Sequence, residues 1–249
     1  MSPLAAITSE AVLAAFLVMC RVGACFLVAP GFSNARVPVE VRLFLAVAMA
    51  LALTPAVFDV VRPAVSLLDP VGLLRAIAHE LLVGVLIGFL ARLFLAALQT
   101  LAVAAGQAVG LGGIPSAPIV DDEPIPAMAT LFTLTATALV FVFDLHWELI
   151  RGLVASYETL PPGAGIDLSA TLADVADQLS ATFLVALRVM SPFLMFAVVV
   201  NLAVGLVNKL TPQIPAFFIA LPFMIAGALV VLAITVREIL EAFLDAYRS

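Results

Sequence analysis

Both histidines of the chain lie close to carboxylates, a pairing that general acid–base catalysis and metal binding both use. His79 is followed directly by Glu80, and His146 has Asp144 and Glu148 two residues to either side. The His79-Glu80 pair is not the zinc motif of metalloproteases, because no second histidine follows at the required spacing. His146 has no serine or cysteine in the sequence context of a nucleophile. The sequence around the two histidines therefore does not predict an enzyme.

The two cysteines, Cys20 and Cys25, lie five residues apart in one apolar segment. This spacing places them on different faces of a helix, and the chain contains no CxxC motif or His/Cys cluster. We therefore expect two free, buried thiols, with no metal site and no cofactor.

Several charged residues lie within or at the edges of apolar stretches, where a charge must face protein or water rather than lipid. Arg21, Glu80 and Arg188 are three of them. Glu80, Gly84 and Gly88 share one helical stripe at four-residue spacing, and small residues there let a second helix approach closely. We interpret these five residues as helix-packing positions with polar anchors, in preference to a role in ion or proton handling.

The composition of the chain indicates the class of protein in which these charged residues lie. Of the 249 residues, 64% are hydrophobic and 11% are charged, whereas soluble domains are about half apolar and about a quarter charged. The chain is therefore predicted to be an integral membrane protein or a subunit buried in a membrane-associated assembly. The net charge is −6, and the basic residues are scattered singly, so no nucleic-acid partner is expected. The basic residues are also nearly balanced between the two sides, so they do not establish the orientation.

Six hydrophobic blocks follow one another along the chain, most of them long enough or nearly so to cross a hydrocarbon core, which takes ~20 helical residues. Abundant alanine and leucine without two-residue alternation favour helices over a barrel. The sequence thus predicts an all-α membrane protein, a single domain over residues 1–249, with long, broken helical hairpins. The blocks cover approximately residues 11–30, 41–58, 71–112, 127–150, 179–207 and 214–238.

The third block is too long for one span, so it is either one very long helix or a helix broken at its glycines. We predict a long helix that ends near Val109, followed by an apolar loop to about Pro126, because GLGGIPSAP cannot continue a regular helix. Such a hydrophobic loop is either a buried or re-entrant connector or a movable apolar gasket that closes a pore. The residues of this predicted plug are Gly110, Leu111, Gly112, Gly113, Ile114, Pro115, Ser116, Ala117 and Pro118.

The longest polar interval is Arg151–Gln178, with a turn predicted at Pro161-Pro162-Gly163. Ser169 or Thr171 can cap a short amphipathic helix that follows this turn. We expect that helix to be an exposed interfacial element.

The stretch Asn201–Pro222, NLAVGLVNKLTPQIPAFFIALP, places polar residues and prolines inside some of the most apolar sequence of the chain. Polar groups at membrane depth need partners in protein or water, because lipid offers none. The stretch is therefore predicted to be a working part of the protein.

Taken together, several stretches resemble the FliR family, the flagellar export-gate subunit that is similar to the T subunit of injectisomes. The resemblance covers nearly the full length, and its motifs occur in the expected order. The chain departs from the family in DLHW before His146 and in GLGGIPSAP, where a Met-rich version is usual. The matching residues are Arg21 with Ala29-Pro30, Val37-Pro38 with Val41-Arg42, Glu80 with Gly84 and Gly88-Phe89, His146 with Ser156, Tyr157 and Pro161, and Asn201, Leu202, Gly205, Leu206, Asn208, Pro212, Gln213, Phe217 and Pro222.

This resemblance implies a non-enzymatic role in the bacterial inner membrane, at the flagellar basal body. One copy joins several FliP- and FliQ-like subunits in a helical gate, with FlhB- and FlhA-like proteins as further partners, and unfolded flagellar proteins pass through its channel. The resemblance also implies a plug at about Leu111–Pro118. With this resemblance, the polar residues of Asn201–Pro222 are interpreted as contacts to neighbouring subunits or to the turn between the last two helices, rather than to a ligand. Its assembly residues are Asn201, Gly205, Asn208, Lys209, Pro212, Gln213, Phe217 and Pro222.

Two other functions were weighed. A small-solute secondary transporter also has broken segments with polar residues, but the two halves of this chain share no clear internal repeat. An intramembrane enzyme lacks a catalytic constellation. Between flagellar and injectisome use, the flagellar signature matches better.

Overall fold

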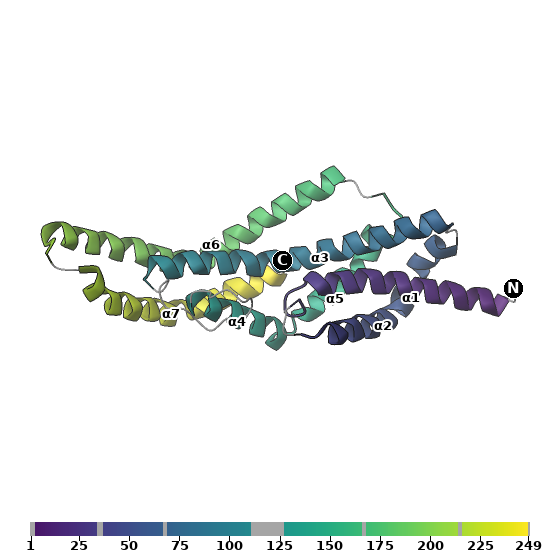
Figure 1. Cartoon of the computed structure of the whole chain (residues 1–249), viewed down its shortest axis with the longest axis horizontal. Helices are drawn as coiled ribbons and strands as arrows, with labels where there is room; N and C mark the ends of the chain where they lie inside the picture. The colour runs from purple at the N-terminus through teal and green to yellow at the C-terminus, as the bar shows by residue number, and fades with distance from the viewer. Residues whose placement is uncertain are drawn as a thin grey trace. The chain divides into compact units, whose positions relative to one another are not determined.

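Helices make up nearly all of the described structure (Figure 1). The computed structural model describes residues 3–33, 37–66, 69–110, 127–165, 168–213 and 216–248, and these residues contain no strand. Five helices are long and apolar enough to cross a membrane, or six spans if the bent pair α4 and α5 counts as one. The expected all-α membrane fold is confirmed. The helices are α1 Pro3–Val28, α2 Val39–Ser66, α3 Pro70–Ala108, α4 Ala127–Val142, α5 His146–Thr159, α6 Leu168–Leu210 and α7 Ala216–Arg248.

Two helices are much longer than a single membrane crossing requires. α3 has 39 residues and α6 has 43, which at 1.5 Å per residue gives lengths of about 58 Å and 64 Å. A hydrocarbon core is only ~30 Å thick. α3 ends at Ala108, so the prediction of one long helix ending near Val109 is confirmed, and Gly106 does not interrupt it.

The block predicted over residues 127–150 is not one helix. α4 ends at Val142, α5 begins at His146, and their axes differ by 69°. Asp144 between them has a φ of 56°, a left-handed conformation that aspartate tolerates better than most residues. The apolar pattern continues across this break, which explains why composition alone did not locate it.

The polar interval is also organised differently from the prediction. The turn at Pro161-Pro162-Gly163 is confirmed, since the Ala164 amide donates to the Pro161 carbonyl at 3.1 Å and Gly163 has a φ of 81°. The separate short amphipathic helix is wrong, because α6 runs unbroken from Leu168 to Leu210. No glycine or proline occurs between Gly165 and Pro192 to stop it.

By its internal contacts the chain divides into two compact units. Unit 1 contains Met1–Arg92 and His146–Asp177, and unit 2 contains Leu93–Leu145 and Gln178–Ser249. The expectation of a single domain over residues 1–249 stays a prediction.

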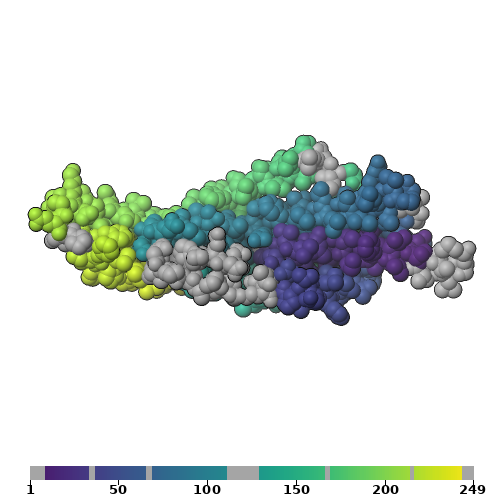
Figure 2. Space-filling view, in the orientation of Figure 1, coloured from purple at the N-terminus to yellow at the C-terminus, as the bar shows by residue number. Residues whose placement is uncertain are grey.

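In unit 1, α1 is the central element. It packs along α2, as the adjoining purple and dark blue surfaces in Figure 2 show, and α2 also contacts α5. Leu17, Val18 and Val22 of α1 are completely buried in an apolar core. α1 is thus held on several sides, and half of its membrane-length segment is buried within the chain.

The core of unit 2 forms between α3, α4, α6 and α7. Leu98 of α3, Phe132 of α4, Phe193 of α6 and Ala228 of α7 belong to one buried cluster. The Phe132 and Phe193 rings meet edge to face, with their centroids 5.6 Å apart. α6 and α7 form the final hairpin (Figure 1).

Candidate functional site

An ion pair is completely buried in unit 1, between α1 and α3. The Arg21 Nε donates to Glu80 Oε2 at 2.7 Å, and Arg21 Nη2 donates to Glu80 Oε1 at 2.8 Å. Both side chains have an exposed fraction of 0%. Two parallel hydrogen bonds between a guanidinium and a carboxylate are the strongest form of this interaction.

The remaining polar face of Arg21 is directed to α5 and the residue after it. Its Nη1 donates to Ser156 Oγ at 2.9 Å, and its Nη2 donates to the Leu160 carbonyl at 2.8 Å. The guanidinium carbon also lies 3.8 Å from the centre of the Tyr157 ring. Carbonyls at the end of a helix lack intrahelical partners, so a cation there is doubly favourable. Arg21 therefore connects α1 to both α3 and α5.

Two glycines of α3 allow α1 to approach closely enough for this pair to form. A Cβ atom at Gly84 would clash with the Arg21 carbonyl oxygen, and one at Gly88 would lie 2.6 Å from the Cys25 carbonyl oxygen. The two helices thus meet backbone to backbone at these positions. The structure brings together Arg21, Glu80, Gly84 and Gly88. The four-residue spacing related the last three to one another, but it did not relate Arg21 to them.

The fifth predicted anchor does not join this group. Arg188 lies on α6 in unit 2, its side chain is exposed, and it has no polar partner among the described residues. Conversely, sequence reasoning assigned no anchoring role to Ser156, Tyr157 or Leu160. Ser156 and Tyr157 were noted only for their family resemblance, because nothing in the sequence relates them to a residue more than 130 positions earlier.

The geometry of this buried group does not support catalysis. The carboxylate and the guanidinium satisfy each other, and the neighbouring His79 Nδ1 lies 3.4 Å from Glu80 Oε1. Within the described residues no group of three or more His, Cys, Asp or Glu side chains could hold a metal ion. Cys20 and Cys25 are both buried and unpaired, as expected.

The predicted assembly residues lie together on the α6–α7 hairpin, and all of them are exposed. Four lie on α6, two in the connection and two on α7. Pro222 does not end α7, which continues through it. In order these residues are Asn201, Gly205, Asn208, Lys209, Pro212, Gln213, Phe217 and Pro222.

Asn201 makes two side-chain hydrogen bonds to other residues of the chain. Its Nδ2 donates to the Ala108 carbonyl at 2.7 Å and to the Ala197 carbonyl at 2.8 Å. Ala108 is the last residue of α3, so Asn201 satisfies a carbonyl that the helix itself leaves unpaired. Gly110, two residues later, has a φ of 83° and faces Leu221 of α7. The rest of the predicted plug, Leu111–Pro118, lies outside the described residues.

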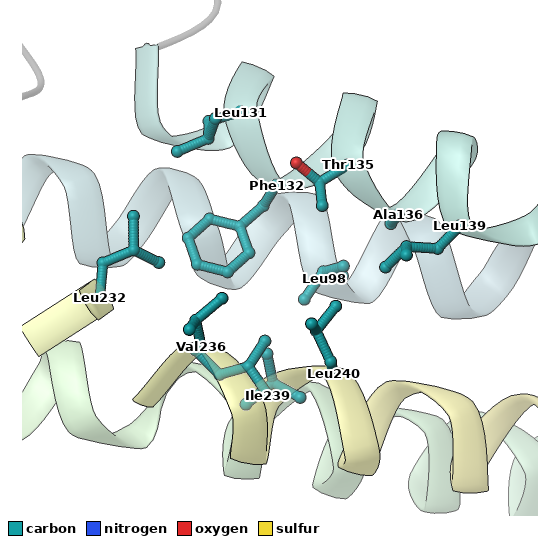
Figure 3. A pocket seen from close by; sticks show the side chains of 11 residues that line it. Leu98, Leu131, Phe132, Thr135, Ala136, Leu139, Leu232, Val236, Ile239 and Leu240 are labelled. Atoms are coloured by element: carbon teal, nitrogen blue, oxygen red, sulfur yellow. The ribbon is translucent and has the colours of Figure 1, made fainter. Parts of the chain in front are cut away.

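An apolar cavity of about 150 Å³ lies among the helices of unit 2 (Figure 3). Side chains from α4 and α7 point toward one another across it, with Leu98 of α3 at its back. Thr135 is the only polar residue that lines it. The cavity offers neither a charge nor an amide to a polar solute, so it does not resemble a substrate site of a transporter.

Comparison with known proteins adds an independent observation. The sequence model of a family described as "Bacterial export proteins, family 1" matches residues 12–249. The flagellar biosynthetic protein FliR of Caulobacter vibrioides is 32% identical over 97% of this chain and 96% of its own length. FliR of Escherichia coli is 30% identical over 83% of this chain and 78% of its own length. FliR of Bacillus subtilis is 27% identical over 90% of this chain and 86% of its own length.

Proposed function

Because the chain belongs to the FliR family of bacterial export proteins, we propose that it is a structural subunit of the flagellar export gate that builds a channel with FliP- and FliQ-like subunits. At the coarser level, family membership makes it a membrane-embedded component of flagellar export. In the proposed gate, unfolded flagellar proteins pass through the shared channel, and FlhB- and FlhA-like proteins bind nearby. The proposed location is the bacterial inner membrane.

The main observation that supports this proposal is that the α6–α7 hairpin is largely exposed. Only 11% of the apolar window of α7 is buried within the chain, against 50% for α1. Large apolar residues along it are widely exposed, with Phe218 at 73% and Phe223 at 75%. Polar side chains such as Asn208 and Gln213 lie exposed among them and have no hydrogen-bond partner in the described part of the chain. A surface with both features suits contact with other subunits better than contact with lipid alone.

The buried group around Arg21 supports a structural role from the other unit. The ion pair and the hydrogen bonds of Arg21 connect α1, α3 and α5 to one another, as expected of a structural group. Firm internal packing of this kind, in unit 1 by itself, suits an assembly subunit.

The test is co-purification. A tagged copy of this chain, produced together with FliP- and FliQ-like subunits, is expected to retain them through detergent extraction and size-exclusion chromatography as one stable complex. An unrelated tagged membrane protein of similar hydropathy serves as the control and should retain neither. A chain that stays monodisperse in their presence, and that moves a small solute across liposomes by itself, would show a transporter instead.

A further inference from the structure

One face of α6 carries uncovered residues at alternating spacings of four and three. This is the spacing of a helix-packing seam, in which each successive contact lies about one helical turn further along. Exposed fractions along it are 62% for Leu184, 70% for Met195, 68% for Val198 and 65% for Leu202. We name this face the α6 seam; it consists of Leu184, Arg188, Ser191, Met195, Val198, Leu202, Gly205 and Lys209.

The opposite side of α6 already has its partners. Val189, Met190, Phe193 and Ala197 are buried in the core of unit 2, with exposed fractions of 0 to 3%. The α6 seam therefore faces away from that core. Nothing among the described residues of unit 2 covers its exposed positions.

The seam carries positive charge that the described part of the chain does not neutralise. Arg188 and Lys209 are both exposed and have no polar partner for their side chains among the described residues. No acidic residue occurs between Asp177 and Glu238. Lys209 lies in the last turn of α6, where a cation is favourable and its long side chain can reach a wet boundary. Arg188 has apolar turns on both sides, so an anion from outside the described residues is expected to pair with it.

Gly205 indicates what approaches the seam. Glycine is less favourable than alanine inside a helix, and a Cβ atom at Gly205 would meet nothing within 4 Å. At Gly227, by contrast, the Phe196 ring occupies the space. A glycine on an exposed helix face lets the backbone of another helix approach closely. Flexible lipid chains adapt to the surface and do not require a small residue there.

We propose that the α6 seam is the docking surface for one helix of a neighbouring export-gate subunit, and that this helix places a carboxylate against Arg188. The inference rests on the proposed function and adds the chemistry of the partner. Two features favour this occupant over a lipid: the regular spacing of the seam, and the exposed Gly205, which lets a helix approach closely. The partner helix is expected to be apolar, with small residues opposite Gly205.

The test uses the complex assembled from the full chain and its subunits. Replacing Arg188 by glutamine should reduce the amount of neighbouring subunit retained about tenfold or more, because the carboxylate is left unpaired in the interface. Arg188→Lys keeps the charge and should retain most of the complex. Arg237→Gln is the matched control, since Arg237 is also exposed on the hairpin but pairs locally with Glu241 at 2.9 Å. The chain alone should keep its helicity in all three variants.

Charge reversal identifies the partner. Arg188→Glu should abolish retention, and an acidic-to-basic change in one helix of the neighbouring subunit should restore it. A photo-crosslinking residue at Met195 should capture that same subunit, while one at Leu43 of α2, outside the hairpin and also exposed at 58%, serves as the off-seam control.

Three outcomes would count against the inference, and they are distinguishable. If the wild-type chain retains no subunit, the proposed function fails. If it retains them and Arg188→Gln retains them equally well, the paired carboxylate is wrong. If Met195 crosslinks only to phospholipid, the anion is a lipid phosphate and the seam is no subunit interface.

Discussion

At the scale of single residues, Arg21 combines an ion pair, further hydrogen bonds and an aromatic contact in one buried side chain. It pairs with Glu80 and donates to both Ser156 and Leu160 at distances below 3 Å. Burying a charge is unfavourable unless it is paired and fully hydrogen-bonded. Removing one residue of a buried ion pair therefore leaves the other charge buried without a partner, which lowers stability. The pair therefore matters mainly because either half alone is destabilising.

We predict that Arg21→Gln lowers the free energy of unfolding by about 3–5 kcal/mol, because Glu80 is left buried without its partner. Glu80→Gln should act similarly through the unpaired guanidinium. The measurement is the midpoint of thermal or denaturant unfolding of the purified protein in detergent, followed by circular dichroism.

The double variant Arg21→Gln with Glu80→Gln separates pairing from packing. It should lose less stability than the sum of the two single changes, since no unpaired charge remains. Arg151→Gln is the surface control, because the Arg151–Glu148 pair is exposed at 73% and 45%, and exposed pairs contribute about 1 kcal/mol or less. Additive losses in the double variant would contradict the argument.

At the scale of elements, the contact between α1 and α3 depends on the absence of side chains. Gly84 and Gly88 lie one helical turn apart and face the carbonyls of Arg21 and Cys25. Backbone atoms cannot move aside as the end of a flexible side chain can, so an added methyl group must separate the helices. Separation would also lengthen the hydrogen bonds between Arg21 and Glu80.

We predict that Gly84→Ala destabilises the protein by about 1–3 kcal/mol, since the overpacking exceeds the gain in helix propensity of about 1 kcal/mol. Gly152→Ala on α5 is the matched control. A Cβ atom there meets nothing within 4 Å, so this variant should be neutral or more stable by up to about 1 kcal/mol. The unfolding midpoints of both variants test whether their changes in stability differ in sign. Equal effects would show that propensity, rather than helix contact, determines the result.

At the scale of the whole molecule, the segment after α3 is where we propose a plug. Asn201 donates to the carbonyl of Ala108, and Gly110, the first residue of the proposed plug, turns the chain with a positive φ. The departure point of that segment is therefore anchored to α6, while the rest of the plug, Leu111–Pro118, stays a prediction.

We predict that deleting Gly112–Ser116 leaves the complex assembled but makes the membrane permeable to small molecules. The reason is that the assembly surface proposed on the hairpin is separate in sequence from the deleted residues. Uptake of a small fluorescent dye by cells that produce the complex measures permeability, and co-purification verifies assembly. Unchanged dye uptake by a fully assembled deletion complex would rule out the gasket.

The sequence by itself determined the membrane class, the helical content and the long reach of α3, because composition and nearby prolines and glycines act within a few residues. It also grouped Glu80, Gly84 and Gly88, whose relation is a helical repeat. The break at Asp144 went unpredicted because the apolar pattern continues across it. The unbroken course of α6 went unpredicted because the change from polar to apolar sequence after Gln178 does not end the helix.

Only the tertiary structure decided what lies across from what. The partners of Arg21 on α5 are 135 and 139 residues away, and no local pattern encodes such a pairing. Arg21 and Arg188 both lie in apolar helices in the sequence, yet one is enclosed by acceptors and the other is bare. Burial depends on how helices pack, a property of many distant residues together, and that packing separates an internal anchor from a surface awaiting a partner.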